Sequence, residues 1–159
     1  MKTFNEWLIS ESINIVHIDP EEDWEEAEQA EAISKLVKIR PDSTKSPTII
    51  ALNDKEEVVG AAFTSWSPDY DASEMAGEDV SVWDFDVVVH PNWQGREMIG
   101  IKLIKQAEEE RKNMESMYGQ KAYTRTWVVN PRLAKVMQNR YGYDAESSYE
   151  DGSAHLVKH

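Results

Sequence analysis

Two hydrophobic periods alternate along the chain, the two-residue period of β-strands and the 3.6-residue period of amphipathic helices. Strand-like runs occupy Ile13–Ile18, Thr48–Leu52, Val58–Phe63, Val80–Val89, Lys121–Val129 and a terminal hairpin over Ser147–Val157. Helical patterns occupy Thr3–Glu11, Asp19–Arg40, a long segment after Pro91 that ends near Tyr118, and Pro131–Tyr141. This order predicts a single domain over residues 1–159, an α/β fold in which helices cover one mixed sheet.

Capping residues indicate where the first long helix begins. Asp19 is a good N-cap residue, and Pro20 suits the first helical position. The core side of this helix is predicted to carry Trp24, Ala27, Ala30, Ile33 and Val37. The Arg40–Pro41 pair is expected to end it, because a residue before proline avoids the helical conformation.

Two carboxylates lie inside the most apolar strand-like run, Val80–Val89. Asp84 and Asp86 are two residues apart, so a strand places both on one face. A desolvated Asp is paired, hydrogen-bonded or raised in pKa, and a carboxyl with a raised pKa suits a general base. The alternative is that this face is partly open to water.

The junction from this strand into the long helix is a candidate anion site. A turn containing Pro91 and Gly95 leads into a helix whose first turn is predicted to carry Arg96 and Gly100. The unpaired backbone N–H groups of a helix start bind phosphate or pyrophosphate, and glycine lets a ligand approach the backbone. Many such turns bind nothing, so the pattern alone is a weak signal.

Acids outnumber bases, with 30 Asp and Glu against 17 Lys and Arg and a formal net charge of −13. Nucleic acids are bound mainly through Lys and Arg, so we expect no nucleic-acid partner and favour a cationic one. The segment Ser67–Asp79 holds five acids and no base. It is predicted to be a loop, either a solvated surface or a rim that attracts cations.

The absence of cysteine excludes disulfides, thiolate metal sites and a cysteine nucleophile. No run of about 20 apolar residues is available for a membrane span. The acidic N-terminal stretch does not resemble a signal peptide. We therefore expect a cytoplasmic protein with no membrane contact, and the His, Asp and Glu spacings predict no metal site.

The sequence resembles the GNAT superfamily of acyl-CoA N-acyltransferases. The segment Val89–Arg96, followed by Ile99–Gly100, is similar to the coenzyme A signature of that family. Asn130 after a strand, with a helix closed by Tyr141–Tyr143, is similar to its second signature. The hairpin from Thr48 to Phe63 is similar to the second and third strands of the family, and the resemblance covers nearly the whole chain.

The resemblance implies a mostly antiparallel central sheet flanked by helices and transfer of an acetyl group from acetyl-CoA to a primary amine. In such a mechanism a neutral amine attacks the thioester directly, and the protein removes a proton from the amine. The acceptor implied is an amine-bearing, cationic small molecule or peptide. The implied coenzyme contacts are the strand residues Val87, Val88 and Val89, the amides of Gln94, Gly95, Arg96, Met98, Ile99 and Gly100, and the side chain of Asn130.

Candidate catalytic residues follow from the same resemblance. Asp84 or Asp86 is the expected base, acting directly or through water. Many members carry a Tyr as general acid where this chain has Gln138, which cannot deliver a proton. Tyr141, one helical turn further on, is the expected substitute, and the alternative is that it is an aromatic core residue. Glu97 stands near a usual glycine of the coenzyme loop, and we expect it to point to solvent.

Two rival readings remain. The first is a catalytically degenerate member that binds coenzyme A or a protein through its acidic surface, and Gln138 and Glu97 favour it. The second is an acidic decoy that mimics nucleic acid, although acids such as those of Glu21–Glu31 are more simply a solvated helix face. The resemblance implies that the loops Arg40–Pro47 and Ser67–Asp79 determine which acceptor is bound. Pairing of terminal strands into a homodimer is one alternative for the oligomeric state.

Overall fold

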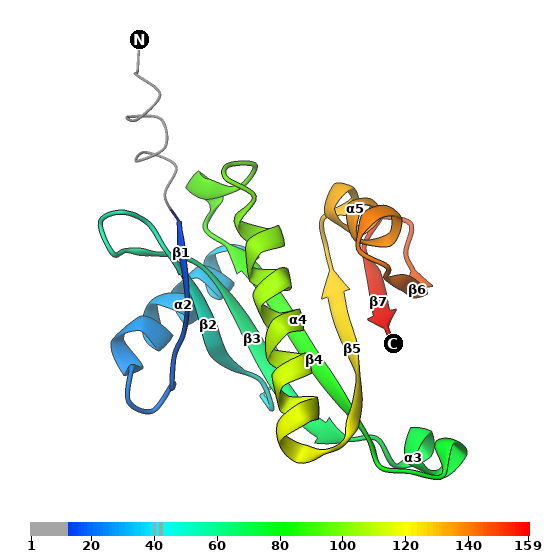
Figure 1. Ribbon diagram of the computed structural model, residues 1–159. Helices are drawn as coiled ribbons and strands as arrows, with labels where there is room; N and C mark the ends of the chain where they lie inside the picture. Colours follow the sequence, from blue (N-terminus) through cyan, green and yellow to red (C-terminus); the bar gives the residue numbers. More distant parts are fainter. Residues whose placement is uncertain (1–12, 40, 42) are drawn as a thin grey trace. The chain divides into compact units, whose positions relative to one another are not determined.

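The structure is a computed structural model that describes residues 13–39, 41 and 43–159 (Figure 1). The described residues form seven strands, four α-helices and one short 3-10 helix. The strands are β1 (Asn14–His17), β2 (Ser46–Leu52), β3 (Val58–Pro68), β4 (Val80–Val89), β5 (Lys121–Val128), β6 (Asp144–Ser148) and β7 (Ala154–Lys158). The helices are α2 (Trp24–Leu36), α3 (Tyr70–Ala76), α4 (Ile99–Tyr118), α5 (Pro131–Arg140) and the 3-10 turn η1 (Pro91–Trp93).

Hydrogen bonds join the strands in the order β1-β2-β3-β4-β5-β7-β6. The β4–β5 pair is parallel, with register from Val80–Lys121 to Phe85–Thr126. The β1–β2, β5–β7 and β6–β7 pairs are antiparallel. The prediction of a mixed, mostly antiparallel sheet with helices is therefore confirmed, and β4 has the predicted bounds.

The start of α2 and the segment Ser67–Asp79 differ from their predicted local structure. Helix α2 begins at Trp24 and not at Pro20, because Asp19 instead closes a turn by accepting a hydrogen bond from the Glu21 amide at 3.0 Å. Trp24, at the start of the helix, is 56% exposed and does not belong to the core. The predicted loop Ser67–Asp79 contains α3, which Asp69 caps by accepting from the Ala72 amide at 3.0 Å. The helix expected over Thr3–Glu11 lies outside the described residues.

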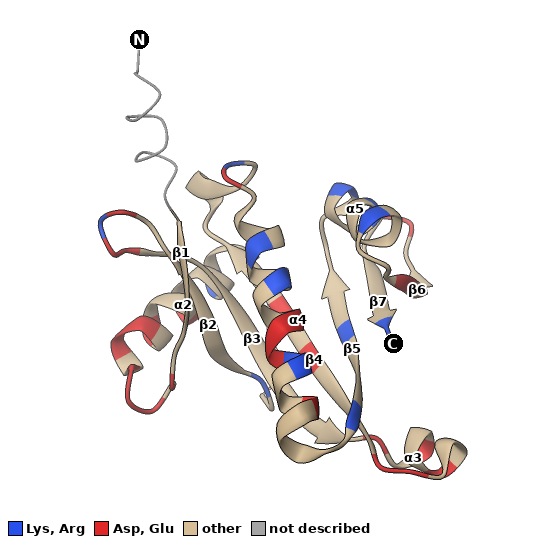
Figure 2. Ribbon diagram, in the orientation of Figure 1, with Lys and Arg blue, Asp and Glu red and all other residues tan. Residues whose placement is uncertain are grey.

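The chain divides into two compact units. The first comprises the chain up to Phe63 together with Val87–Ala107, and the second comprises Thr64–Asp86 and Glu108–His159. Figure 2 shows acidic segments in both, in the turn before α2 and along α2, and around α3. Within the described residues, no helix combines the length and the hydrophobicity needed to cross a membrane.

Close packing in the first unit depends on Gly60 of β3. A Cβ atom added there would lie 3.0 Å from the Val88 carbonyl oxygen, 3.1 Å from Ile99 Cγ2 and 3.2 Å from Leu103 Cδ1. Glycine thus lets β3 approach β4 and the first turns of α4. A hydrophobic core cluster of the same unit consists of Ile18, Ala27, Ala30, Ile33, Ile50, Val58, Ala61, Phe63 and Val88.

A buried polar network organises the second unit. Arg111 of α4 is 7% exposed and donates to the carbonyl oxygens of Ala122 and Lys158, at 3.3 and 3.4 Å. It also pairs with Glu108 at 3.3 Å, and the Tyr143 hydroxyl donates to Glu108 at 2.6 Å. Burial, together with the charge and hydrogen bond of Glu108, raises the pKa of Tyr143 well above its usual range. The network joins α4 to β5, β7 and the segment after α5.

The packing at Gly60 predicts the effect of one added methyl group. Gly60→Ala should lower the free energy of unfolding by about 1–3 kcal/mol, because the new Cβ forces its neighbours apart. Urea denaturation followed by far-UV circular dichroism measures the loss. Ser67→Ala, at an exposed position of the same strand, is the control and should change stability by less than about 0.5 kcal/mol. Equal stability of Gly60→Ala and wild type would refute the close approach.

The buried network predicts that removing one ionic partner destabilises the fold more than removing both. Arg111→Met should cost about 3 kcal/mol, because it leaves the buried Glu108 carboxylate without its main partner. The double variant Arg111→Met, Glu108→Gln should recover part of this loss, since it removes the buried charge as well. Thermal and urea unfolding measure both variants. Lys112→Met, at the exposed neighbouring position, serves as control, and a loss there as large as that of Arg111→Met would argue against the network.

Candidate functional site

The turn after β4 is held by hydrogen bonds of its own side chains. The His90 amide donates to the Val59 carbonyl of β3 at 2.8 Å, and His90 Nδ1 accepts from the Asn92 amide at 3.1 Å. Gln94 Nε2 donates back to the Val89 carbonyl at 3.0 Å. These bonds fix the direction in which the chain leaves the sheet within the first unit.

The loop then runs through residues 94–98 before α4 begins at Ile99. The prediction that Arg96 lies in the first turn of the helix is therefore wrong. Arg96 donates to the Asn92 carbonyl at 3.1 Å, and its guanidinium lies 4.4 Å from the centre of the Trp93 ring. Its cation is thus held over the 3-10 turn η1.

The backbone of this loop is left-handed at three positions. Gly95 has φ 74°, and the two non-glycine residues Glu97 and Met98 have φ 57° and 53°. A left-handed conformation costs a residue with a side chain about 1–2 kcal/mol. Glu97 and Met98 therefore adopt a backbone conformation that favours glycine, at a cost in free energy. Such strained conformations occur often in functional loops.

The start of α4 presents a set of backbone donors. The first helical hydrogen bond runs from the Lys102 amide to the Met98 carbonyl at 2.9 Å. The amides of Ile99, Gly100 and Ile101 precede it and have no acceptor within the helix. Together with the positive end of the helix dipole, such amides can bind a phosphate or pyrophosphate.

The sequence led us to expect that Glu97 points to solvent, but in the structure the side chain is only partly directed to solvent. The residue is half-buried, and its Oε2 atom is shielded from water and accepts no hydrogen bond. The expectation fails because a left-handed loop, and not the exposed side of a helix, directs this side chain. A carboxylate is consequently part of the loop whose amides can bind an anion.

The two aspartates of β4 have different surroundings in the second unit. Asp84 Oδ2 accepts from Arg125 Nε at 3.2 Å and from its Nη2 at 2.9 Å, and Arg125 is its direct partner in the β4–β5 register. Burial lowers the pKa of Arg125, but the hydrogen bond and charge of Asp84 outweigh this and raise it. Asp86 is 5% exposed. Sequence reasoning missed Arg125, although its alternation with Tyr123 marks one face of β5.

The residues of the second signature have local structural roles. Asn130 Oδ1 caps α5 by accepting from the amides of Arg132 and Leu133 at 2.9 and 3.2 Å. Tyr141 is half-buried and follows the end of α5, where its amide donates to the Met137 carbonyl at 3.1 Å. Gln138 is exposed, and its Nε2 donates to the Ala134 carbonyl at 3.2 Å.

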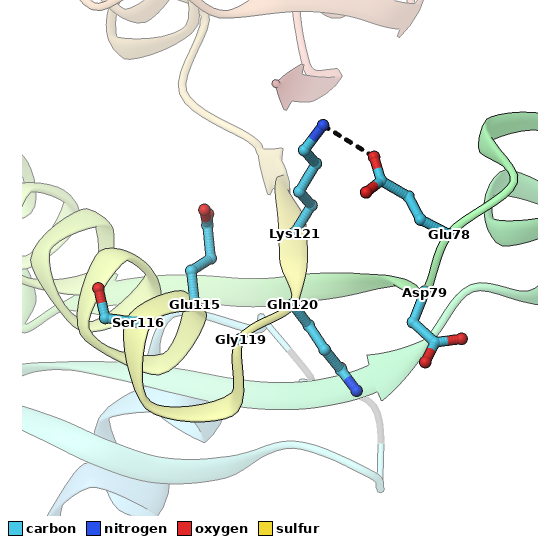
Figure 3. A pocket seen from close by; sticks show the side chains of 7 residues that line it. All are labelled: Glu78, Asp79, Glu115, Ser116, Gly119, Gln120 and Lys121. Atoms are coloured by element: carbon cyan, nitrogen blue, oxygen red, sulfur yellow. Dashed lines mark ion pairs between the residues drawn. The ribbon is translucent and has the colours of Figure 1, made fainter.

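A separate pocket of about 470 Å³ lies in the second unit (Figure 3). The residues that line it are Glu78, Asp79, Glu115, Ser116, Gly119, Gln120 and Lys121. Lys121 Nζ pairs with Glu78 Oε1 at 2.8 Å, and this hydrogen bond and charge raise the pKa of Lys121. None of the residues predicted for coenzyme binding or catalysis lines this pocket. Among the described residues, no group of three His, Cys, Asp or Glu side chains is placed to hold a metal ion.

The fold matches solved acetyltransferases over nearly their whole length. One is a chain of the NatC complex bound to Gag peptide and CoA, with 13% identity, a TM-score of 0.62 and coverage of 92% of this chain and 98% of the other. Another is an agmatine N-acetyltransferase, with 14% identity, a TM-score of 0.61 and coverage of 93% and 100%. A third is a GNAT-family acetyltransferase from Streptococcus pneumoniae, with 12% identity, a TM-score of 0.59 and coverage of 92% and 99%.

Sequence comparison adds no relative to this structural likeness. No protein-family model matches the chain, and no curated protein matches it. The structural matches nevertheless cover 92% to 93% of the chain that carries the element order and the mixed sheet described above. The chain therefore has the fold of the GNAT acyl-CoA N-acyltransferases.

Proposed function

We propose that the protein is an N-acetyltransferase that transfers the acetyl group of acetyl-CoA to a primary amine of a small-molecule or peptide acceptor. The observation that carries the proposal is the start of α4, where the amides of Ile99, Gly100 and Ile101 precede the first helical hydrogen bond. A GNAT-type fold that presents such donors after its fourth strand is suited to the diphosphate of a coenzyme.

The chain's own residues fit this cosubstrate in all but one respect. Gly95 is exposed, and nothing lies within 4 Å of where a Cβ would be, so a ligand can approach the backbone there. Arg96 adds positive charge to the same loop. Glu97, with its shielded Oε2 atom, opposes anion binding. Residues Val87–Val89, in the same unit as this loop, are proposed to hold the pantetheine arm.

Proton removal from the attacking amine is assigned to Asp86. When bound, acetyl-CoA supplies a thioester whose acyl carbon an amine can attack. A base needs an oxygen that can receive the proton, and the guanidinium of Arg125 already donates twice to Asp84. Asp86 is also the more buried of the two, at 5% exposed. Tyr141 is proposed to donate a proton to the departing thiolate.

A second candidate function is supported by Glu97. A GNAT-fold protein without catalysis would bind a protein partner through its acidic surface, and a shielded carboxylate oxygen in the coenzyme loop favours this alternative. Calorimetric titration with acetyl-CoA and with coenzyme A separates the two. Micromolar binding is required by the transferase and justifies a screen of polyamines, aminoglycosides and Lys peptides, in which coenzyme A release distinguishes the transferase from a member that binds coenzyme A without catalysis. Absence of binding at millimolar ligand supports the second candidate.

The assignment of Asp86 predicts the kinetics of two variants. With an amine identified by the screen, Asp86→Asn should lower kcat by about 100-fold or more, because general base catalysis is lost. The KM for acetyl-CoA should stay within about twofold of wild type, since the base acts in the transition state. Asp84→Asn should lower kcat less, and Asp79→Asn, at an exposed position, is the control. A larger loss in Asp84→Asn would make Asp84 the base.

The position of Glu97 predicts a gain in coenzyme affinity. Glu97→Gln removes the charge and keeps the size of the side chain, and it should tighten coenzyme A binding by about fivefold, which corresponds to about 1 kcal/mol of lost repulsion. Isothermal titration calorimetry at low salt measures the change. Glu109→Gln, on an exposed part of α4, removes the same charge as a control. Equal affinities in wild type and Glu97→Gln would show that the carboxylate does not face the ligand.

A further inference from the structure

One face of the C-terminal sheet in the second unit is open. Along β5, Ala122, Thr124, Thr126 and Val128 are buried, whereas the alternate residues Tyr123, Arg125 and Trp127 are half-buried or exposed. On β7, Ala154 and Leu156 are buried and His155 is half-buried. A strand points successive side chains to opposite faces, so helices and core cover one face and leave the other accessible.

Three rings, from β5, from β7 and from the residue after β6, meet on this face. Trp127 of β5 lies opposite His155 of β7 in the register, and their rings are stacked at 5.8 Å with an interplanar angle of 18°. The ring of Tyr149, just after β6, lies in an edge-to-face arrangement with this histidine, at 5.8 Å and 71°. The outer rings remain accessible, since Trp127 is 41% and Tyr149 50% exposed. The Trp127–His155–Tyr149 cluster is therefore an ordered aromatic surface.

The strand beside the cluster carries a carboxylate at an irregular position. The β6–β7 register passes from Ala145–Leu156 to Ser147–His155, so that Glu146 has no residue opposite it. Such a bulge redirects a side chain. Glu146 is exposed, and the next residue, Ser147, pairs with His155 of the cluster and donates its hydroxyl to the Tyr149 hydroxyl at 3.5 Å.

Charge around the cluster is predominantly negative. The segment from β6 to β7 contains Asp144, Glu146, Glu150 and Asp151 and no Lys or Arg before Lys158. Lys158 lies beside Glu108, at 3.9 Å, and beside the Tyr143 ring. Arg125, the cation nearest in sequence to Trp127, is paired with Asp84. Aromatic faces with neighbouring carboxylates attract ammonium groups through the ring quadrupole and through charge.

We propose that the Trp127–His155–Tyr149 cluster, with Glu146, binds an organic ammonium ion. As a ligand site it rests only on the rings and charges of the second unit. As a site for the cationic part of the acceptor, it rests on the proposed function. The aromatic rings select an alkylated or aliphatic ammonium over a hydrated metal cation, because they contact its apolar substituents.

Tetramethylammonium chloride is the probe, because it carries the charge and cannot be acetylated. Uniformly ¹⁵N-labelled protein is titrated, and the indole N–H signal of Trp127 is identified by its absence in Trp127→Leu. We expect a saturable shift of this signal at millimolar probe. Neutral tert-butanol, of similar size, and sodium chloride at equal ionic strength should produce less than one fifth of that shift.

Variants assign the binding to the cluster. Tyr149→Leu should weaken binding at least fivefold, Tyr149→Phe should retain it, and Glu146→Gln should weaken it about threefold. Trp24→Leu, which removes an exposed Trp of the first unit, should bind as wild type does. These side chains are exposed, and unchanged circular dichroism verifies folding of each variant.

Three outcomes would overturn the proposal. They are equal shifts with tert-butanol, undiminished binding in Tyr149→Leu and Glu146→Gln together, and a Trp127 signal that responds to protein concentration and not to the probe. The last would show that a second copy of the chain covers this face. Coenzyme A titration of the same samples tests the proposed function separately, because it requires no residue of the cluster.

Discussion

The close approach of β3 to the start of α4 is the constraint on which the loop of residues 94–98 depends. Gly60 has no side chain, so the Val88 carbonyl and the side chains of Ile99 and Leu103 can lie against the β3 backbone. This contact fixes the first turns of α4 beside the end of β4. The intervening residues must then close a short connection, and they do so with left-handed backbone at Glu97 and Met98. Packing in the core therefore maintains an unfavourable conformation in the loop.

Polar contacts have the corresponding role in the second unit. Arg111 is buried and donates to two strand carbonyls while it pairs with Glu108. A buried ion pair adds little net stability over apolar packing, but removing only one of its two partners strongly destabilises the fold. Its geometric requirement fixes α4 relative to β5 and β7 more narrowly than apolar side chains would. Among the described residues, the open face of β5 and β7 carries Arg125 and the ring cluster.

Periodicity and motif order were sufficient to predict the strands, α4, α5 and the mixed sheet, because each element has a long and regular pattern. Local capping was less informative, since Asp19 and Asp23 are both acceptable near a helix start and only the folded turn distinguishes them. The candidate site was predicted in part. The loop and both aspartates were identified, but the partner of Asp84 follows from the pairing of strands some forty residues apart, which no local pattern contains. The direction of the Glu97 side chain could not be predicted without knowing the left-handed backbone conformation of its loop.

The charge balance explains why different ligands suit different parts of the chain. The chain has 30 acids against 17 bases, and at least four of the bases already have a partner. Arg111, Lys121 and Arg125 each pair with a carboxylate, and Arg96 lies over Trp93. A diphosphate bound to this chain would depend on the backbone amides at the start of α4, because an anion complements the partial positive charge of a helix N-terminus. Side chains elsewhere present carboxylates and aromatic rings, which favour a cation. An acidic protein can thus combine an anionic cosubstrate with a cationic acceptor, provided that the backbone binds the first and the side chains bind the second.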